Sequence, residues 1–355
     1  MERKTNKGRS YNGRVILYAI MAGFCVLALI EIIYGRLQSQ AKQDQNAVPE
    51  DNNSKIVKEI AADGGDSGNI DVPDIPLQGG MTESTEGNEV DGTDDNTPNK
   101  TENADMQIVF MGDSILDSVR EYDGVAYLIS QACNADVYNM SIGGTTAALL
   151  EDDKYDFNDW SSCSLLGVVH AILGDIDGDF LAPYRAGEIL EECDFSKTDY
   201  FVIEYGINDF LARIPDSQYT KEGELRDIDA LHTYVGALEA AIDSLHNAFP
   251  TAKILLISPH YCQFFREEDD AYIGDSYSLD YGYGPMIGYS NLCSYVCGNN
   301  KQKNVLYYNT IMDSGIDAYS ADDYLEDGIH LTSAGRRVYA EHAANIINAD
   351  FRKNE

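Results

Sequence analysis

Four short motifs of this chain carry groups that could attack an acyl carbonyl. In chain order they are Gly112-Asp113-Ser114, Asn139-Met140-Ser141-Ile142-Gly143-Gly144, Gly206-Ile207-Asn208-Asp209 and Asp327-Gly328-Ile329-His330. The first motif supplies a serine hydroxyl, the middle two supply N–H donors, and the last supplies an Asp/His pair. A nucleophile, a base and a cluster of donors are what acyl transfer requires. Each motif alone is a weak signal, but the four together indicate a serine-based site.

A serine hydroxyl needs a base to remove its proton, and histidine has a suitable pKa at neutral pH. His330 is the best candidate among the six histidines, because Asp327 lies three residues earlier in a glycine-containing loop and could hold the other ring nitrogen. His260, which follows a predicted strand, is the alternative base. The other four histidines are predicted to be surface or core residues.

Short apolar, β-branched segments alternate with longer helical patterns, which is typical of βαβ units and a parallel sheet. The predicted strands lie near residues 107–111, 135–139, 200–205, 253–258 and 304–308. Apolar periodicity predicts a helix within 228–249, and Thr332 or Ser333 should cap a last helix that reaches about Asn348. The predicted fold class is α/β, a three-layer α/β/α sandwich with a central parallel sheet of about five strands, flavodoxin-like in type.

Parallel sheets bind ligands at the carboxyl ends of their strands. Ser114, Gly144 and Asn208 each follow a predicted strand end. The topology therefore predicts that three of the four motifs meet at one edge of the sheet.

The order of the four motifs resembles that of the SGNH hydrolases, the GDSL esterase/lipase superfamily, over roughly residues 105–350. The resemblance implies that Ser114 is the nucleophile, His330 the base and Asp327 the residue that orients it. It also implies an oxyanion hole made by the backbone N–H groups of Ser114 and Gly144 and the side-chain amide of Asn208.

One point of this resemblance stays open, and one residue departs from the family pattern. Gly143 and Gly144 are adjacent, so the donor could be displaced by one residue, and Leu331 stands where many relatives have proline, which concerns loop rigidity more than chemistry. Asp113 and Asp209 are expected to fix the loops that carry Ser114 and Asn208.

The first hundred residues divide into a basic tail (1–14), an apolar segment (Val15–Tyr34) and an acidic linker (35–103). The apolar segment is long enough to cross a hydrocarbon core about 30 Å thick as a helix. Its basic N-terminal flank predicts a cytoplasmic N-terminus and an exported domain, 104–355. We therefore predict a single-pass signal anchor in the cell membrane. The alternative is a signal peptide cleaved near Ala41, followed by secretion.

The linker contains no aromatic residue between Leu37 and Asn103 and is dominated by acidic, small and polar residues. Such a segment cannot bury enough apolar surface to offset its ordering entropy. The sequence therefore predicts a disordered tether that holds the folded domain away from the membrane.

A formal net charge of −35 argues against binding of nucleic acid or anionic membranes by the exported part, and it favours neutral or cationic acyl esters. The six cysteines after the apolar segment permit disulfides, but their spacing does not define a pairing. Cys293 and Cys297 are predicted to be packing residues of a helix. No cofactor and no metal site are predicted.

Two long connections separate predicted strands. Residues 151–198 carry the only tryptophan, Trp160, and residues 260–290 hold a cluster of aromatic residues. These rings could pack within the connection itself, or they could form a wall that binds a sugar or an acyl group, because the connection leaves the sheet at the edge predicted for Ser114.

The function predicted from these residues is that of an extracytoplasmic serine esterase that removes short acyl groups, chiefly acetyl, from a small molecule or a polysaccharide. One alternative is an O-acyltransferase that uses the same serine on cell-envelope glycans and requires a partner protein to supply the acyl donor. The other is a noncatalytic glycan-binding protein.

Overall fold

The computed structural model describes residues 104–150, 163–220, 223–266 and 268–353. The predicted basic tail, transmembrane segment and acidic linker lie outside these residues, as does Trp160. None of the helices in the described part of the chain is both long and apolar enough to cross a membrane.

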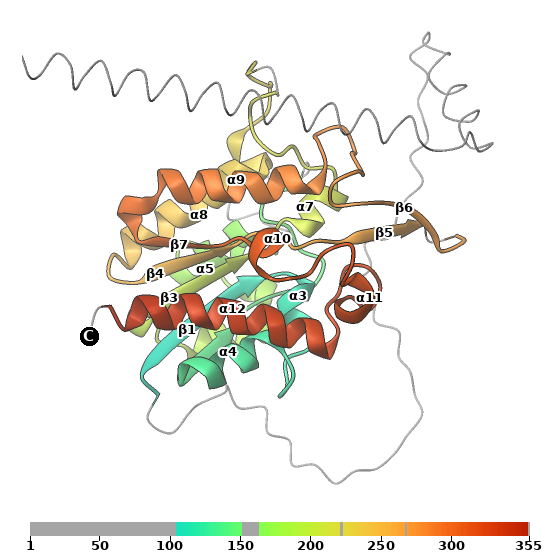
Figure 1. Cartoon of the computed structure of the whole chain (residues 1–355). Coiled ribbons are helices and arrows are strands. Elements are labelled where there is room, and N and C mark those ends of the chain that lie inside the picture. The colour runs from blue at the N-terminus through green and yellow to red at the C-terminus, as the bar shows by residue number, and fades with distance from the viewer. Residues whose placement is uncertain (1–103, 151–162, 221–222, 267, 354–355) are drawn as a thin grey trace, which may run out of the picture. The chain divides into compact units, whose positions relative to one another are not determined.

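Five parallel strands form the central sheet in the spatial order β2-β1-β3-β4-β7 (Figure 1). The strands are β1 (Met106–Gly112), β2 (Ala135–Asn139), β3 (Tyr200–Glu204), β4 (Lys253–Ile257) and β7 (Val305–Tyr308). Each agrees with its predicted counterpart to within one residue at either end. A parallel sheet is covered on both faces, which explains the nearly continuous apolar sequences of its strands.

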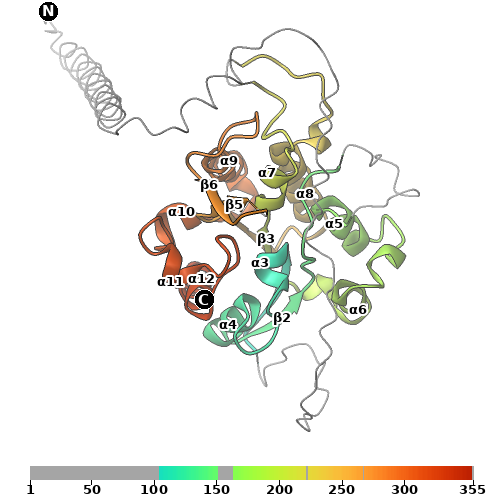
Figure 2. The same cartoon turned by 90° about the vertical axis from the view of Figure 1, so that its right-hand side faces the viewer.

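Helices cover both faces of the sheet, as the alternating pattern predicted (Figures 1 and 2). The helices α4 (Val125–Cys133) and α12 (Ser333–Phe351) pack together on one face, while α5 (Leu165–Leu173), α8 (Tyr234–Ala248) and α9 (Met286–Asn299) cover the other. The predicted three-layer α/β/α sandwich is therefore confirmed for the described residues. The shorter helices are α3 (Ser114–Asp117), α6 (Arg185–Glu192), α7 (Ile207–Leu211), α10 (Thr310–Asp313), α11 (Ala321–Tyr324), η2 (Asp179–Leu181), η3 (Phe195–Lys197), η4 (Ala230–His232) and η5 (Lys301–Lys303).

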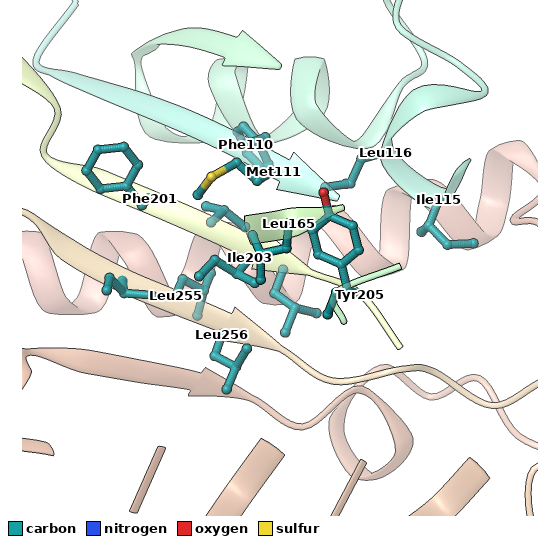
Figure 3. Close-up of a cluster of buried hydrophobic side chains, with 14 of the residues drawn as sticks. Phe110, Met111, Ile115, Leu116, Leu165, Phe201, Ile203, Tyr205, Leu255 and Leu256 are labelled. Carbon is teal, nitrogen blue, oxygen red and sulfur yellow. The ribbon is translucent and has the colours of Figure 1, made fainter. Parts of the chain in front are cut away.

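The apolar core continues from the central strands to the first turn of α3 (Figure 3). Ile115 and Leu116, which directly follow Ser114, are buried together with Tyr205 at the end of β3. Burying a side chain of this size contributes about 1.5–3 kcal/mol. Because Ile115 and Leu116 are fixed in the core, the backbone of Ser114 is held at the surface of the sheet edge.

Both predicted helices are present, but their ends differ from those predicted. The helix predicted within 228–249 begins only at Tyr234, because Thr233 is extended and caps α8 by accepting the Gly236 N–H. The last helix begins at Ser333 with Thr332 as its cap, as predicted, but continues to Phe351. Cys293 and Cys297 are buried in α9, as expected for packing residues, and no disulfide joins any two of the described cysteines.

Both long connections contain elements that the sequence patterns did not predict. The first contains α5, α6 and two 3-10 turns, and the second contains an antiparallel hairpin of β5 (Gln263–Arg266) and β6 (Ala271–Asp275). The hairpin shifts register between Phe264 and Phe265. This shift breaks the simple alternation of buried and exposed residues by which a strand is recognised in a sequence.

Candidate active site

The four motifs lie together at the carboxyl edge of the parallel sheet, which Figure 2 views from the front. Ser114 begins α3 directly after β1, Gly144 lies in the loop after β2, and Asn208 lies in α7 directly after β3. The Asp327–His330 loop precedes α12. The edge position predicted for the first three motifs from strand order agrees with the structure.

Ser114, His330 and Asp327 form a continuous series of hydrogen bonds. The His330 Nε2 lies 2.9 Å from the Ser114 Oγ, and the His330 Nδ1 lies 2.7 Å from the Asp327 Oδ2. The second oxygen of Asp327 accepts the backbone N–H groups of Ile329 (3.0 Å) and His330 (2.8 Å). With the Nδ1 proton donated to Asp327, the Nε2 is the nitrogen that can accept the serine proton.

Asp327 and His330 each stabilise the charged form of the other. Partial burial raises the pKa of Asp327, but hydrogen bonds from the His330 ring and backbone outweigh burial and hold that pKa well below its usual range. The hydrogen bond to Asp327 raises the pKa of His330 against the opposing effect of burial, and the negative charges of Asp327 and Asp113 raise it further. Asp327 is thus a carboxylate at neutral pH, and His330 is a stronger base than a free imidazole.

Asp113 links the serine to the asparagine. Its side chain is fully buried, and its Oδ1 accepts the Ile115 N–H at 3.0 Å as the cap of α3. Its Oδ2 accepts a hydrogen bond from the Asn208 Nδ2 at 3.2 Å. Burial raises the pKa of Asp113 to about 6, against the effect of the Ile115 hydrogen bond.

Asp209 connects the helix that carries Asn208 to the loop of the glycine pair. Its two oxygens accept the backbone N–H groups of Ala147 (2.9 Å) and Ala148 (3.0 Å), so it ties the segment after Gly144 to α7. Burial raises the pKa of Asp209 to about 7, although these backbone hydrogen bonds oppose the shift. These two hydrogen bonds link the segment expected to be fixed by Asp209, that of Asn208, with the segment that follows Gly144.

The two adjacent glycines differ in whether their backbone N–H groups already have an acceptor. Gly143 donates its N–H to the Asp117 Oδ2 at 2.7 Å. Gly144 has a φ of +76°, a conformation that favours glycine, and a Cβ added there would meet no atom within 4 Å. Among the described residues, none accepts the N–H of Gly144 or that of Ser114. Of the two glycines, Gly144 is therefore the one that can donate to a substrate.

Both hydrogens of the Asn208 amide already have acceptors. Besides the contact with Asp113, the Nδ2 donates to the Thr145 carbonyl at 3.0 Å. A substrate oxygen can receive a hydrogen bond from Asn208 only if it shares or replaces one of these acceptors. The contact with Asp113, at 3.2 Å, is the longer of the two.

Asp117 and Arg120 support the site, and the sequence analysis missed both. Arg120 donates to Asp117 (2.7 Å) and to the carbonyls of Asn139 (2.8 Å) and Ser141 (2.6 Å). These contacts attach the loop after β2 to the end of α3. The sequence does contain a pattern that could have identified them, because Ser114, Asp117 and Arg120 follow one another at intervals of three residues, a spacing that brings side chains to one face of a helix.

His260, the alternative base, supports the His330 loop instead. Its ring is fully buried, and its Nε2 lies 2.8 Å from the Ile329 carbonyl. Burial lowers the pKa of His260 to about 4, so the ring is neutral at physiological pH. The contact with the Ser114 hydroxyl belongs to His330.

Two groups of aromatic residues from 260–290 lie near the motifs, an inner group of three rings and an outer pair. The inner rings of Phe264, Tyr281 and Tyr289 surround Phe210, with ring centroids 5.3, 5.1 and 5.9 Å from it. These three rings therefore pack against α7 and not only within the connection. Phe210 lies two residues after Asn208, so the inner group also supports α7.

The outer aromatic pair consists of Phe265 and Tyr272, whose rings meet edge to face at 5.8 Å. They are 38% and 53% exposed. The hairpin that carries them is attached to the Asp327–His330 loop, because Gln263 donates its N–H to the Gly328 carbonyl at 2.8 Å. A Cβ added at Gly328 would lie 2.8 Å from a ring carbon of Phe265. The outer aromatic pair thus lies beside the loop that carries His330.

Within the described residues, no group of three or more histidine, cysteine, aspartate or glutamate side chains could hold a metal ion.

The model of the GDSL-like lipase/acylhydrolase family matches residues 110–338 of the chain. A search of curated proteins found no match. The chain is similar in fold to a protein from Lactobacillus plantarum, at 16% identity and a TM-score of 0.46 over 69% of this chain and 98% of that one.

Two other similar structures are esterases. One is a catalytic mutant of Axe2, an acetylxylan esterase from Geobacillus stearothermophilus (19% identity, TM-score 0.40, 70% of this chain and 96% of that one). The other is a carbohydrate esterase family 2 enzyme with a carbohydrate-binding domain from Corynascus thermopiles (18% identity, TM-score 0.42, 70% and 68%). Because the family match extends from β1 into α12 and so includes all four motifs, the chain belongs to the GDSL-like lipase/acylhydrolase family of the SGNH hydrolase superfamily and is a carboxylic ester hydrolase.

Proposed function

We propose that the protein is an extracytoplasmic serine esterase that removes short acyl groups, chiefly acetyl, from a glycan. The observation that carries this proposal is the series of contacts from Ser114 through His330 to Asp327, at 2.9 and 2.7 Å. This geometry supports proton transfer from the hydroxyl to the ring as the oxygen attacks.

The reaction runs in two halves. The Ser114 Oγ attacks the acyl carbonyl while its proton passes to the His330 Nε2, and the carbonyl π electrons move to the oxygen. Collapse of this intermediate breaks the ester bond, and the departing sugar oxygen takes the proton from His330. Water then attacks the acyl-serine while its proton passes to the His330 Nε2. Collapse breaks the bond between the acyl carbon and the Ser114 Oγ, which takes the proton back from His330, and the carboxylic acid leaves.

The N–H groups of Ser114 and Gly144 and the amide of Asn208 are the proposed oxyanion donors. Donors placed where negative charge develops stabilise the transition state more than the bound substrate. For Asn208, the oxyanion would share or replace Asp113 as the acceptor, since that contact is the longer of the two.

Asn208→Ala is expected to lower kcat by about 10²–10³-fold with little change in KM, as for other oxyanion-hole donors. Steady-state kinetics on p-nitrophenyl acetate test this, with the melting temperature as a check on folding. A loss confined to KM would instead make Asn208 a residue that binds substrate.

Asp327→Asn is expected to move the acid limb of the kcat/KM profile to lower pH. His330 must be neutral to act as a base, and the charge of Asp327 raises the pKa of His330, so wild-type activity should rise through a pKa above the ordinary histidine value. Removing that charge lowers this pKa, while the plateau falls because the ring is less well oriented. An unchanged limb would show that His330 is not the group that titrates.

The outer aromatic pair supports a glycan as substrate. Tyrosine and phenylalanine rings offer flat apolar faces to sugar rings, and the pair lies beside the His330 loop. The net charge of −35 favours a neutral or cationic substrate. The predicted anchor and tether would hold the domain near envelope glycans.

The double variant Phe265→Ala/Tyr272→Ala is expected to reduce deacetylation of acetylated xylan by roughly tenfold or more, since two stacking contacts are lost. Cleavage of p-nitrophenyl acetate should change less than threefold, because the small ester needs only the serine and its donors. Tyr295→Ala, which removes a comparably exposed tyrosine from α9, is the matched control and should change neither activity. Equal losses on both substrates would reject the outer aromatic pair as a sugar-binding surface.

The function itself is tested by incubating the purified protein with acetylated xylan, acetylated peptidoglycan and p-nitrophenyl esters of increasing acyl length. Free acid and acyl groups transferred to added sugars are followed together. Release of acetate from a glycan supports the proposal. Transfer in excess of hydrolysis identifies an O-acyltransferase, and absence of both on all glycans rejects the glycan substrate.

A further inference from the structure

Glu204 is a buried carboxyl group beneath the nucleophile that the proposed mechanism does not use. It ends β3, in register with Gly112 of β1, and its side chain is fully buried. A Cβ added at Gly112 would lie 3.2 Å from the Glu204 Oε2. The carboxyl group therefore fills the space that the glycine leaves open, two residues before Ser114.

Among the side chains that the structure describes, no cationic group acts on Glu204 to balance a carboxylate. Among the described residues, neither oxygen has a hydrogen-bond partner in good geometry, and the one backbone donor that favours its charged form is the N–H of Asp113. The ionisable groups that face it are one carboxyl, three tyrosines and two cysteines: Asp113, Tyr205, Tyr234, Tyr339, Cys262 and Cys293. An isolated buried carboxylate is far more costly than a neutral acid.

The neighbouring carboxyl of Asp113 has the donors that Glu204 lacks. It accepts the Ile115 N–H at 3.0 Å and the Asn208 amide at 3.2 Å, and His330 adds a favourable charge. Two adjacent buried carboxyl groups cannot both ionise at low cost, so one of them keeps a proton. Because the Ile115 N–H and the Asn208 amide donate to Asp113, Asp113 is the carboxyl group that carries the negative charge, and Glu204 is the one that keeps the proton.

We propose that Glu204 is a neutral carboxylic acid at physiological pH and donates a hydrogen bond to the carboxylate of Asp113. Glu204 is thereby a positioning residue. It fixes the carboxylate that caps the helix of Ser114 and holds the amide of Asn208. Its kinetic consequences rest on the proposed function, whereas its protonation state does not.

The pKa of each group agrees with this assignment. Burial, followed by the charge and the hydrogen bond of the Asp113 side chain, raises the pKa of Glu204 well above its usual value, against the smaller opposing effect of the Asp113 backbone N–H. The pKa of Asp113 is raised only to about 6, so Asp113 is the first of the two to ionise as the pH rises.

Infrared spectroscopy tests the protonation state without reference to activity. At pH 8 the wild-type protein should show the C=O stretch of a buried protonated acid, which is well separated from the carboxylate bands. The band should lose most of its intensity in Glu204→Gln and persist in Glu191→Gln, an exposed glutamate of α6. A wild-type spectrum without this band, or a band of undiminished intensity in Glu204→Gln, overturns the proposal; a weak remaining band is expected from the buried Asp209, whose pKa is about 7.

Kinetics on p-nitrophenyl acetate test the positioning role. Glu204→Gln keeps a neutral donor of the same shape and should retain kcat within about threefold, whereas Glu204→Leu should lower it roughly tenfold or more, because a hydrogen bond to a charged group is lost. In an Asp113→Asn background, Glu204→Leu should add little further loss, since both changes act through one contact. Equal losses in the two Glu204 variants, or losses that add fully to that of Asp113→Asn, overturn the positioning role.

These outcomes separate the proposal from the proposed function. If wild-type protein cleaves no ester, the esterase proposal fails while the infrared result still decides the state of Glu204. If Glu204→Leu does not fold, the infrared bands and kinetics of Glu204→Gln still decide the assignment.

Discussion

Ser114→Ala is expected to abolish measurable ester cleavage, with a fall in kcat of roughly 10³-fold or more. The substitution removes the hydroxyl that lies 2.9 Å from the His330 Nε2. The fold should persist, because α3 is anchored by the buried Ile115 and Leu116 and capped by Asp113, none of which is altered. Initial rates on p-nitrophenyl acetate and the melting temperature measure the two effects separately.

Ser118→Ala is the matched control for this prediction. Ser118 follows the last residue of the same short helix and is exposed. Its replacement should leave both the rate and the melting temperature close to those of the wild type. Turnover near the wild-type rate in a folded, uncontaminated Ser114→Ala protein would contradict the assignment of the nucleophile.

The sheet could be predicted from the sequence because its strands are buried on both faces. Short, continuous apolar segments such as 200–203 have few interpretations when helical patterns lie between them. The position of Ser114, Gly144 and Asn208 at one edge then follows from the rule that parallel strands present their carboxyl ends together. The elements missed were those with weaker periodicity, such as the short helix α6 and the irregular hairpin β5–β6.

The site was harder to predict than the sheet, because hydrogen bonds between residues far apart in the sequence determine how its side chains are arranged. Nothing in the local sequence shows that Asp209 holds Ala147 and Ala148, or that both hydrogens of Asn208 are occupied. The choice between Gly143 and Gly144 likewise depends on Asp117, which lies 26 residues before Gly143. Motif spacing identifies residue types, whereas hydrogen-bond partners determine which atoms remain available.

Two of the long-range contacts of the His330 loop show the same limit. His260 follows a strand end, as a catalytic residue often does, and only its hydrogen bond to the Ile329 carbonyl reveals a supporting role. Gln263 reaches the same loop through the Gly328 carbonyl. Both residues precede the loop by more than sixty positions, so a single sequence contains no signal that pairs them.

His330→Ala is expected to lower kcat by roughly 10³-fold or more, a loss similar to that of Ser114→Ala, because nucleophile and base act as a unit. For the same reason, the double variant Ser114→Ala/His330→Ala should be no slower than either single variant beyond experimental error. Stability should change little, since the His330 side chain is 32% exposed and the loop keeps the backbone hydrogen bonds to Asp327. Initial rates and thermal unfolding of the three variants measure these effects.

His260→Ala provides the contrast that distinguishes the base from its support. This ring is fully buried and holds the Ile329 carbonyl, so its removal leaves a cavity and an unsatisfied carbonyl next to the catalytic loop. The melting temperature should fall, while kcat at a temperature where the protein remains folded should exceed that of His330→Ala by at least about tenfold. If His260→Ala were folded and inactive while His330→Ala remained active, the two histidines would have been assigned the wrong roles, and the 2.9 Å contact between His330 and Ser114 would not represent the catalytic state.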